Sequence, residues 1–215
     1  MFTIALVARK GGSGKTTLAV HLALAAWLRG ARTLLADVDP QRSAIEALRA
    51  RHGLGPDRVA IAGSKLYDLQ MSAVRRGTDV MVIDTAAGVA EEQVSAIVLS
   101  DLCLLVVRPA FLDLAAAIES VDIVRRLKKP LLLVVNQAPA PREGVESPAV
   151  RRALRALALL SQPIAPTIIR SRMVYQRALE TGRSAEEAGD PAAALEIAEL
   201  WAYIRHFALP QRAAG

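Results

Sequence analysis

The sequence predicts an α/β protein with a doubly wound, mostly parallel sheet and helices on both faces. Short apolar runs of strand length alternate with helical patterns along nearly the whole chain. The runs are continuously apolar, which is typical of parallel strands that are buried on both faces. Right-handed crossovers then place a ligand at the carboxyl ends of the strands. Residues 1–215 contain no internal repeat and are expected to form one domain.

Seven apolar runs are expected to form the strands. They are Phe2–Ala8, Thr33–Val38, Val59–Ala62, Val80–Asp84, Leu102–Val107, Leu131–Asn136 and Pro163–Ile169. Helical spacing predicts helices over Thr16–Leu28, Ser43–Arg51, Lys65–Arg76, Ala90–Leu99, Asp113–Leu127, Pro148–Leu160, Val174–Glu180 and Pro191–Phe207. The stretch from Ala138 to Pro148 is rich in proline and charge, and we expect it to be an exposed connection.

A Gly-rich turn, Arg9 to Thr17, follows the first apolar run and opens the first helical pattern. Glycines let backbone N–H groups point at phosphate oxygens, and the helix N-terminus adds partial positive charge. Lys15 is placed to reach the β- and γ-phosphates of a nucleotide, and the Thr16 hydroxyl is placed to ligate Mg²⁺. The residues predicted to bind the nucleotide are Gly11, Gly12, Ser13, Gly14, Lys15, Thr16 and Thr17.

Lys10 to Thr17 resembles the deviant Walker A motif of the ParA/MinD superfamily of P-loop ATPases, KGGxGKT[TS]. Arg9 stands where the usual P-loop pattern has its first glycine, and Lys10 adds a second cation. The resemblance covers nearly the whole chain and is closest to the small plasmid-type ParA proteins, the ParF-like group. It implies that Lys10 reaches across a dimer interface to the phosphates of the partner subunit.

Two carboxylates follow the second strand in the sequence Asp37-Val38-Asp39-Pro40-Gln41. Pro40 restricts Asp39 to extended geometry and ends the strand. Residues two apart on a strand share a face, so we expect Asp37 and Asp39 to lie together. Asp39 resembles the superfamily's second acidic residue, in its DxDPQ motif, which positions the attacking water. The alternative is that both carboxylates cap the strand end by accepting backbone N–H groups.

Val80 to Asp84 has four apolar residues before an aspartate, which is the Walker B pattern. It predicts that Asp84 holds Mg²⁺ through water, and the alternative is a carboxylate that merely caps the strand. The family commonly has a proline after this aspartate, whereas this chain continues with residues 85–88, Thr-Ala-Ala-Gly. Gly88 is expected to keep this loop mobile, as a sensor of the γ-phosphate needs.

Two further residues follow strands near the same edge. Ser100 to Ala116 resembles the SDxxxxxxxP…LDxxAA stretch of ParF-like proteins, and we interpret Asp113 as the N-cap of the next helix. Asn136 ends a strand at a place where the superfamily often has an asparagine that contacts the adenine edge. An asparagine that only shapes a turn is an equally good interpretation.

The chain is basic, with a net charge of +6 and an isoelectric point near 10.0, which favours a polyanionic partner. From residue 142 to residue 183 eight arginines face three glutamates, and Tyr175 is the one aromatic residue. This composition disfavours base stacking and favours contacts with the phosphates of double-stranded DNA that do not depend on its sequence. Solvated arginines are the alternative. The predicted contacts are Arg151, Arg152, Arg170, Arg172 and Arg177.

Other partners and locations are disfavoured by the sequence. One cysteine, Cys103, excludes a disulfide framework, and the three histidines are scattered. The chain enters a strand directly, and no apolar stretch reaches the roughly 18 residues that a membrane span needs. The pattern from Leu195 to Phe207 lacks the basic face of a membrane-binding helix. We therefore expect a cytoplasmic, nucleoid-associated protein without a membrane partner.

Together, the motifs and the resemblance predict a ParA-type ATPase that takes ATP and Mg²⁺ and partitions a plasmid or chromosome. The resemblance implies a homodimer formed on ATP, non-specific binding to double-stranded DNA, and a centromere-binding adaptor in the ParB role. Lys10, Lys15 and Asp39 are the predicted catalytic residues. The alternatives are a relative that positions another cargo (chemoreceptor arrays, division factors or carboxysomes), a metabolic P-loop kinase or ligase, and a nucleotide-gated scaffold with negligible turnover.

Overall fold

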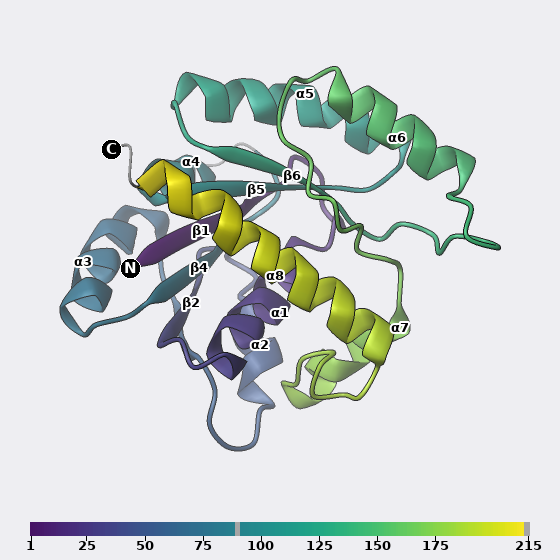
Figure 1. Ribbon diagram of the computed structural model, residues 1–215. Coiled ribbons are helices and arrows are strands. Elements are labelled where there is room, and N and C mark those ends of the chain that lie inside the picture. Colours follow the sequence, from purple (N-terminus) through teal and green to yellow (C-terminus); the bar gives the residue numbers. More distant parts are fainter. Residues whose placement is uncertain (89–90, 213–215) are drawn as a thin grey trace.

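Six parallel strands form one sheet in the order β3-β2-β4-β1-β5-β6 in the computed structural model, which describes residues 1–88 and 91–212 (Figure 1). The predicted fold class is therefore confirmed. The strands are β1 Phe2–Val7, β2 Thr33–Asp37, β3 Asp57–Ala60, β4 Val80–Asp84, β5 Leu102–Val107 and β6 Leu131–Val135. Every residue of β1, β2, β4, β5 and β6 is buried, as their continuously apolar runs predict.

Helices cover both faces of the sheet (Figure 1). Their bounds are α1 Lys15–Leu28, α2 Ser43–Arg49, α3 Leu66–Arg75, α4 Glu91–Leu99, α5 Phe111–Arg126, α6 Pro148–Ala158, α7 Met173–Arg177 and α8 Pro191–Arg212. Two short 3₁₀ turns, Gly63–Lys65 and Ala178–Thr181, adjoin α3 and α7. Ala90, the expected first residue of α4, lies outside the described residues. None of the helices in the described part of the chain has the length and apolarity needed to cross a membrane.

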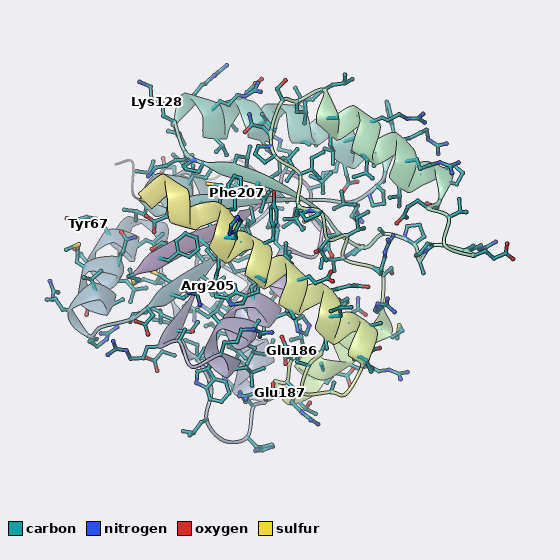
Figure 2. The ribbon with its side chains drawn as sticks, viewed as in Figure 1. Tyr67, Lys128, Glu186, Glu187, Arg205 and Phe207 are labelled. Atoms are coloured by element: carbon teal, nitrogen blue, oxygen red, sulfur yellow. The ribbon has the colours of Figure 1, made fainter. Side chains whose placement is uncertain are left out.

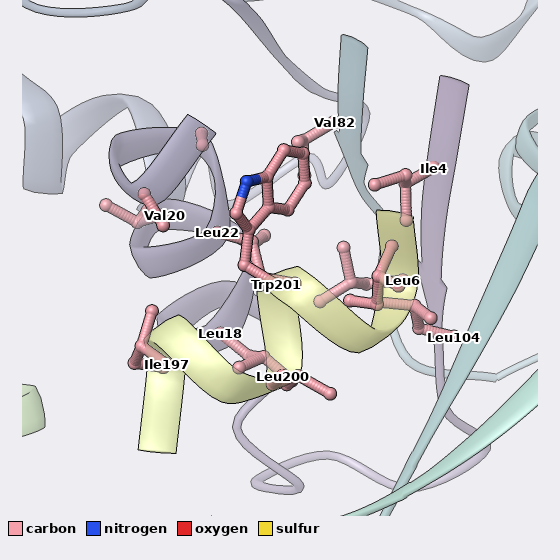
Figure 3. Packing of buried hydrophobic residues seen from close by; sticks show 14 of the residues in the cluster. Ile4, Leu6, Leu18, Val20, Leu22, Val82, Leu104, Ile197, Leu200 and Trp201 are labelled. Carbon is pink, nitrogen blue, oxygen red and sulfur yellow. The ribbon is translucent and has the colours of Figure 1, made fainter. Parts of the chain in front are cut away.

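Alternate residues of the central strands divide the core between the two faces. Ile4 and Leu6 of β1 pack with α1 and α8, whereas Ala5 and Val7 pack on the opposite face. Trp201 of α8 is a central member of the first cluster, where it lies among aliphatic side chains of α1 and the sheet (Figure 3). The position of α8 is therefore fixed by core packing.

The expected seventh strand, Pro163–Ile169, is not a strand. This segment runs beside β6 and makes isolated bridges, Leu133 with Ile164 and Ala138 with Arg170. The N–H groups of Ala165 and Ile169 donate to carbonyls of β6 at 2.8 and 3.0 Å. These donors are four residues apart, whereas their acceptors Leu133 and Val135 are two apart, so the segment bulges at the bend of Pro166 and Thr167 and the ladder is interrupted.

Asp113 is not the N-cap of α5, because the helix begins at Phe111 and Ala110 occupies the cap position. Asp113 lies in the first turn and forms an ion pair with Arg108 at 2.8 Å. A carboxylate in the first turn still lies close to the positive end of the helix dipole. The sequence therefore located the helix start to within two residues but gave Asp113 the wrong partner.

A buried histidine joins α1 to the C-terminal third of the chain. His21 Nε2 donates to the carbonyl of Tyr175 at 3.0 Å, and His21 Nδ1 accepts the N–H of Ala185 at 3.3 Å. This pair of contacts assigns the proton of the neutral ring to Nε2. Burial lowers the pKa of His21 to about 4, although the Tyr175 carbonyl and Glu187 raise it. The fold therefore holds His21 in its neutral form.

Acid is expected to destabilise the fold through His21. Between pH 6.5 and 4 the unfolded chain binds a proton at this histidine and the native chain does not. Lowering the pH through this range therefore decreases the free energy of unfolding by up to about 3 kcal/mol. His21→Gln keeps a donor for Tyr175 and should remove this pH dependence in urea titrations at pH 7, 5.5 and 4.5. His52→Gln, at an exposed site, should retain it. Equal pH dependence in the two variants would contradict the assignment.

Candidate nucleotide-binding site

The Gly-rich turn leaves the carboxyl end of β1 and enters α1 at Lys15. Gly12 and Gly14 have left-handed φ angles of 75° and 85°, which residues with side chains rarely adopt. Two side chains that follow β6 hold the turn. Asn136 Nδ2 donates to the Ser13 carbonyl at 2.7 Å, and Gln137 Nε2 donates to the Gly12 carbonyl at 3.1 Å. The turn is therefore fixed by a neighbouring part of the sheet as well as by its glycines.

A cavity of about 750 Å³ opens above this turn, which is within the range of small-molecule sites. It is lined by Gly11, Gly12, Gly14, Lys15, Thr16, Thr17 and Asp39, all of which the sequence predicted for the site. A smaller cavity of about 120 Å³ adjoins it and is lined by Gly14, Asn136, Gln137 and Tyr175, among others. Gln137 and Gln176 line both cavities. These two glutamines belong to no sequence motif, so they were not among the predicted site residues.

Two buried charges of opposite sign lie beneath the cleft. Burial raises the pKa of Asp84 to about 7; the Thr16 hydroxyl and Lys15 lower it, whereas Asp37 and Asp39 raise it. Burial lowers the pKa of Lys15, and Asp84 and Asp39 oppose that shift. Each charge thus supports the ionised form of the other in a site that excludes water.

The residues at this position suit Mg²⁺. Neither carboxylate oxygen of the fully buried Asp84 has a hydrogen-bond partner among the residues described, although a buried carboxylate normally has one. The Thr16 side chain is close enough to influence this carboxylate. A hard cation ligated by a hydroxyl, water and phosphate oxygens would satisfy Asp84. Thr16 and Asp84 are therefore the residues that would hold the metal.

The two aspartates after β2 have separate roles. Asp37 is buried at the end of the strand and accepts backbone N–H groups of Asp39, Ala44 and Ile45 at 3.0–3.2 Å. It therefore caps α2, which is the structural alternative that the sequence left open. Asp39 lines the cleft, and within the described structure its carboxylate accepts only the N–H of Gln41, at 2.9 Å. One oxygen of Asp39 is thereby left for another donor.

Lys10 does not line the large cleft. It borders a small recess on the α5 side of the turn, together with Asp113 and Ala116, and forms no ion pair with any residue in the described ranges. Its neighbour Arg9 is paired with Glu119 of α5 at 3.1 Å. The two cations before the glycines therefore differ, since Arg9 is compensated within the chain and Lys10 is not.

The five arginines predicted to contact DNA fall into two groups. Arg151 and Arg152 of α6 and Arg177 of α7 are exposed. Arg170 forms a double contact with Glu146, and Arg172 pairs with Glu196 at 2.7 Å. A count of charges along the sequence does not reveal such pairs, so it overstated the cationic surface in this region.

The CobQ/CobB/MinD/ParA nucleotide binding domain, a protein-family model, matches residues 4–184. The chain belongs to this family. The maintenance of carboxysome distribution protein A of Gloeobacter kilaueensis is 33% identical over 183 residues, which cover 84% of this ParA/MinD-family chain and 82% of that relative.

Solved structures show the same P-loop α/β fold. An ATP complex of a variant McdA from Cyanothece has a TM-score of 0.79 at 17% identity, over 98% of this chain and 96% of that one. The septum site-determining protein MinD from Pyrococcus horikoshii, with Mg-ADP, has a TM-score of 0.75 at 18% identity, over 98% of both chains. The match of the family model confirms the ParA/MinD resemblance that the sequence indicated, and these structures agree with it in fold.

The contact between Asn136 and the turn makes a sharp prediction. A methyl group at residue 14 would lie 2.4 Å from Asn136 Nδ2 at a left-handed φ, whereas one at Gly11 would meet nothing within 4 Å. Gly14→Ala should therefore weaken ATP binding by at least about tenfold, which corresponds to roughly 1.4 kcal/mol, while Gly11→Ala should change it little. Calorimetric titration with ATP-Mg²⁺ measures the affinity of both variants. Equal affinities would show that the contact between Asn136 and the turn does not support nucleotide binding.

Proposed function

We propose that this ParA/MinD-family chain is an ATPase that positions a cargo by dimerising on ATP and binding DNA without sequence preference. The observation that carries the proposal is the buried, unpartnered Asp84 carboxylate beside Lys15 and Thr16, with Asp39 in the same cleft. A domain that only bound nucleotide would have no need for a further carboxylate, Asp39, in the cleft with an uncommitted oxygen. This arrangement supports hydrolysis.

Each residue has a physical task in the proposed reaction. The backbone N–H groups of residues 11–16 and the Lys15 ammonium hold the phosphates, and the Thr16 hydroxyl and Asp84 hold Mg²⁺. The ion, when bound, neutralises phosphate charge. Asp39 accepts a hydrogen bond from a water molecule and aligns it with the γ-phosphorus. Fixed donors in a site that excludes water stabilise the charge that develops during transfer.

The dimer is proposed from the position of Lys10. This lysine borders the recess on the α5 side of the Gly-rich turn, outside the cleft, and it has no ion-pair partner within the part of the chain that is described. A second chain whose cleft faced this one would bring its phosphates to the free ammonium. Two cations per site, Lys10 of one chain and Lys15 of the other, would then offset the charge of each triphosphate.

The cargo has two candidates. The ParF-like stretch from Ser100 to Ala116 favours a plasmid or chromosome, with an adaptor in the ParB role. The 33% identity with a carboxysome distribution protein favours a protein assembly as cargo. In both cases we propose a nucleoid-associated dimer whose DNA contacts include the exposed Arg151 and Arg152. The genes beside this one discriminate, because a centromere-binding adaptor and DNA repeats accompany only the first candidate.

Asp39→Ala tests hydrolysis. The variant should bind ATP-Mg²⁺ with unchanged affinity and hydrolyse it about 10²–10³-fold more slowly, since the water loses its orienting acceptor. Asp122→Ala, an exposed carboxylate of α5, is the matched control and should retain full turnover. Phosphate release measured with excess ATP reports both rates. Full turnover in Asp39→Ala would remove this residue from the mechanism.

Lys10→Ala tests the dimer. In sedimentation velocity with ATP-Mg²⁺ on plain duplex DNA, the wild type should sediment as a dimer on the DNA. Lys10→Ala should bind ATP yet remain a monomer that does not sediment with the duplex. Arg9→Ala removes a neighbouring cation that is already paired with Glu119 and should still dimerise. An ATP-dependent dimer of Lys10→Ala would show that the lysine does not act across the interface.

A further inference from the structure

A second hollow lies outside the nucleotide cleft. It has a volume of about 600 Å³ and is bounded on one side by α7 and its 3₁₀ turn, and on the other by the loop of residues 183–190. We define it as the cationic groove by Arg172, Met173, Arg177, Thr181, Arg183 and Asp190. None of the motifs in the sequence accounts for it.

The positive charge of the groove is not compensated locally. Arg177 and Arg183 are exposed, and neither forms an ion pair within the described residues. Asp190 is engaged as a cap, because its Oδ1 accepts the N–H groups of Ala192 and Ala193 at 3.1 and 3.0 Å. Arg172 is paired with Glu196. The Arg183 guanidinium donates one N–H group to the backbone carbonyl of Glu187, a neutral acceptor that leaves its charge uncompensated. The charges of Arg177 and Arg183 therefore border the same hollow without a carboxylate partner among the described residues.

The two glutamates of the loop, which Figure 2 labels, pair with arginines outside the groove. Glu186 pairs with Arg29, the C-cap of α1, at 3.0 Å, and Glu187 forms a bidentate pair with Arg51 at 2.7 and 2.9 Å. Arg51 also donates to the carbonyl of Gly182 at 2.9 Å, so this wall of the groove is fastened to the end of α2. The groove is thus preformed, and its acidic neighbours are fastened to arginines outside it.

The chemistry of the groove selects its occupant. Guanidinium groups bind carboxylates in a planar, bidentate geometry. Met173 lies beside them with 63% of its surface exposed and offers an adaptable apolar contact. Duplex DNA presents its phosphates on a convex surface and offers no apolar side chain that would contact Met173 inside the groove. We propose that the cationic groove binds a segment of a partner protein in which acidic side chains alternate with apolar ones.

The helix α7 connects the groove to the nucleotide cleft. Tyr175, Gln176 and Leu179 line the two cavities of the cleft, whereas Arg177, Ala178 and Thr181 line the groove. A single carboxylate, Glu196, accepts from Arg172 on the groove side and from the Tyr175 hydroxyl, both at 2.7 Å. A ligand that draws Arg172 away from Glu196 changes the contacts of Tyr175. Groove and cleft are therefore coupled, and this coupling, unlike the binding itself, rests on the proposed nucleotide site.

The test uses a fluorescein-labelled peptide of about 12 residues with the repeat Glu-Glu-Leu, and the whole chain without nucleotide. Fluorescence anisotropy should show saturable binding, and Arg177→Glu/Arg183→Glu should weaken it by at least about tenfold, since two charge-assisted contacts become repulsive. Arg75→Glu/Arg76→Glu on α3 makes the same change of net charge at exposed sites and should leave the affinity within about twofold. Circular dichroism confirms that both variants are folded.

Each other result overturns the proposal. Absence of peptide binding to the wild type, or equal weakening in the two double variants, would show that the groove is not the site. Equal affinity for a Lys-Lys-Leu peptide would show that the arginines do not select carboxylates. Binding of labelled duplex DNA that is lost only in Arg177→Glu/Arg183→Glu would assign the groove to nucleic acid.

The coupling is read in a second titration with ATP-Mg²⁺ present, in which the peptide affinity should change by about fivefold or more. An unchanged affinity, with ATP shown to bind, would refute the coupling and leave the groove as a binding site. Failure of ATP to bind at all would instead refute the proposed function, and the nucleotide-free peptide titration would stand unaffected.

Discussion

The cleft depends on one buried carboxylate that the chain leaves without a hydrogen-bond partner. Asp84 is fully enclosed at the end of β4, and an ionised carboxylate in such a place is unfavourable unless a cation compensates it. Burial raises its pKa to about 7, which reflects the unfavourable free energy of the buried charge. Lys15 and Thr16 are the compensating groups within the chain, and both stand at the first turn of α1. The Gly-rich turn therefore has to be held in one shape, which Asn136 and Gln137 do from the end of β6, two strands from β1.

The order of the strands brings these groups together. β4 lies between β1 and β2, so Asp84 is level with Leu6 on one side and Asp37 on the other. The two carboxylates repel each other when both are ionised. The Asp37 carboxylate is stabilised by hydrogen bonds from three backbone N–H groups of the following turn and α2. The turn that these contacts hold lines the cleft with Asp39, Pro40, Gln41 and Ser43. A residue with a structural task thus determines where the proposed catalytic carboxylate lies.

The sequence predicted most of the sheet and of the phosphate-binding turn because both are governed by local signals. Five buried strands are continuous apolar runs, and the glycines at 12 and 14 have the φ angles that the motif requires. Three features escaped it because they depend on tertiary partners. Pro163–Ile169 is apolar enough for a strand, yet it bulges away from β6 between Ala165 and Ile169 and pairs only through isolated bridges. Arg170 and Arg172 carry the expected charge, yet Glu146 and Glu196 compensate them. Gln137 belongs to no motif, and only the fold brings it to the turn.

The pairing of Glu196 with both Arg172 and Tyr175 explains why a five-residue helix can join two sites. α7 is preceded by the extended residue Arg172 and followed by a 3₁₀ turn that ends at Gly182 with a left-handed φ of 64°. Both ends therefore lie close to points where the backbone changes direction, so α7 is a short unit between two turns. Glu196 on α8 is held by the core through Ile197 and Leu200, so it acts as the fixed point. Because coupling between two sites is reciprocal, a nucleotide that positions Tyr175 must favour or oppose the groove ligand to the same extent that the ligand affects the nucleotide.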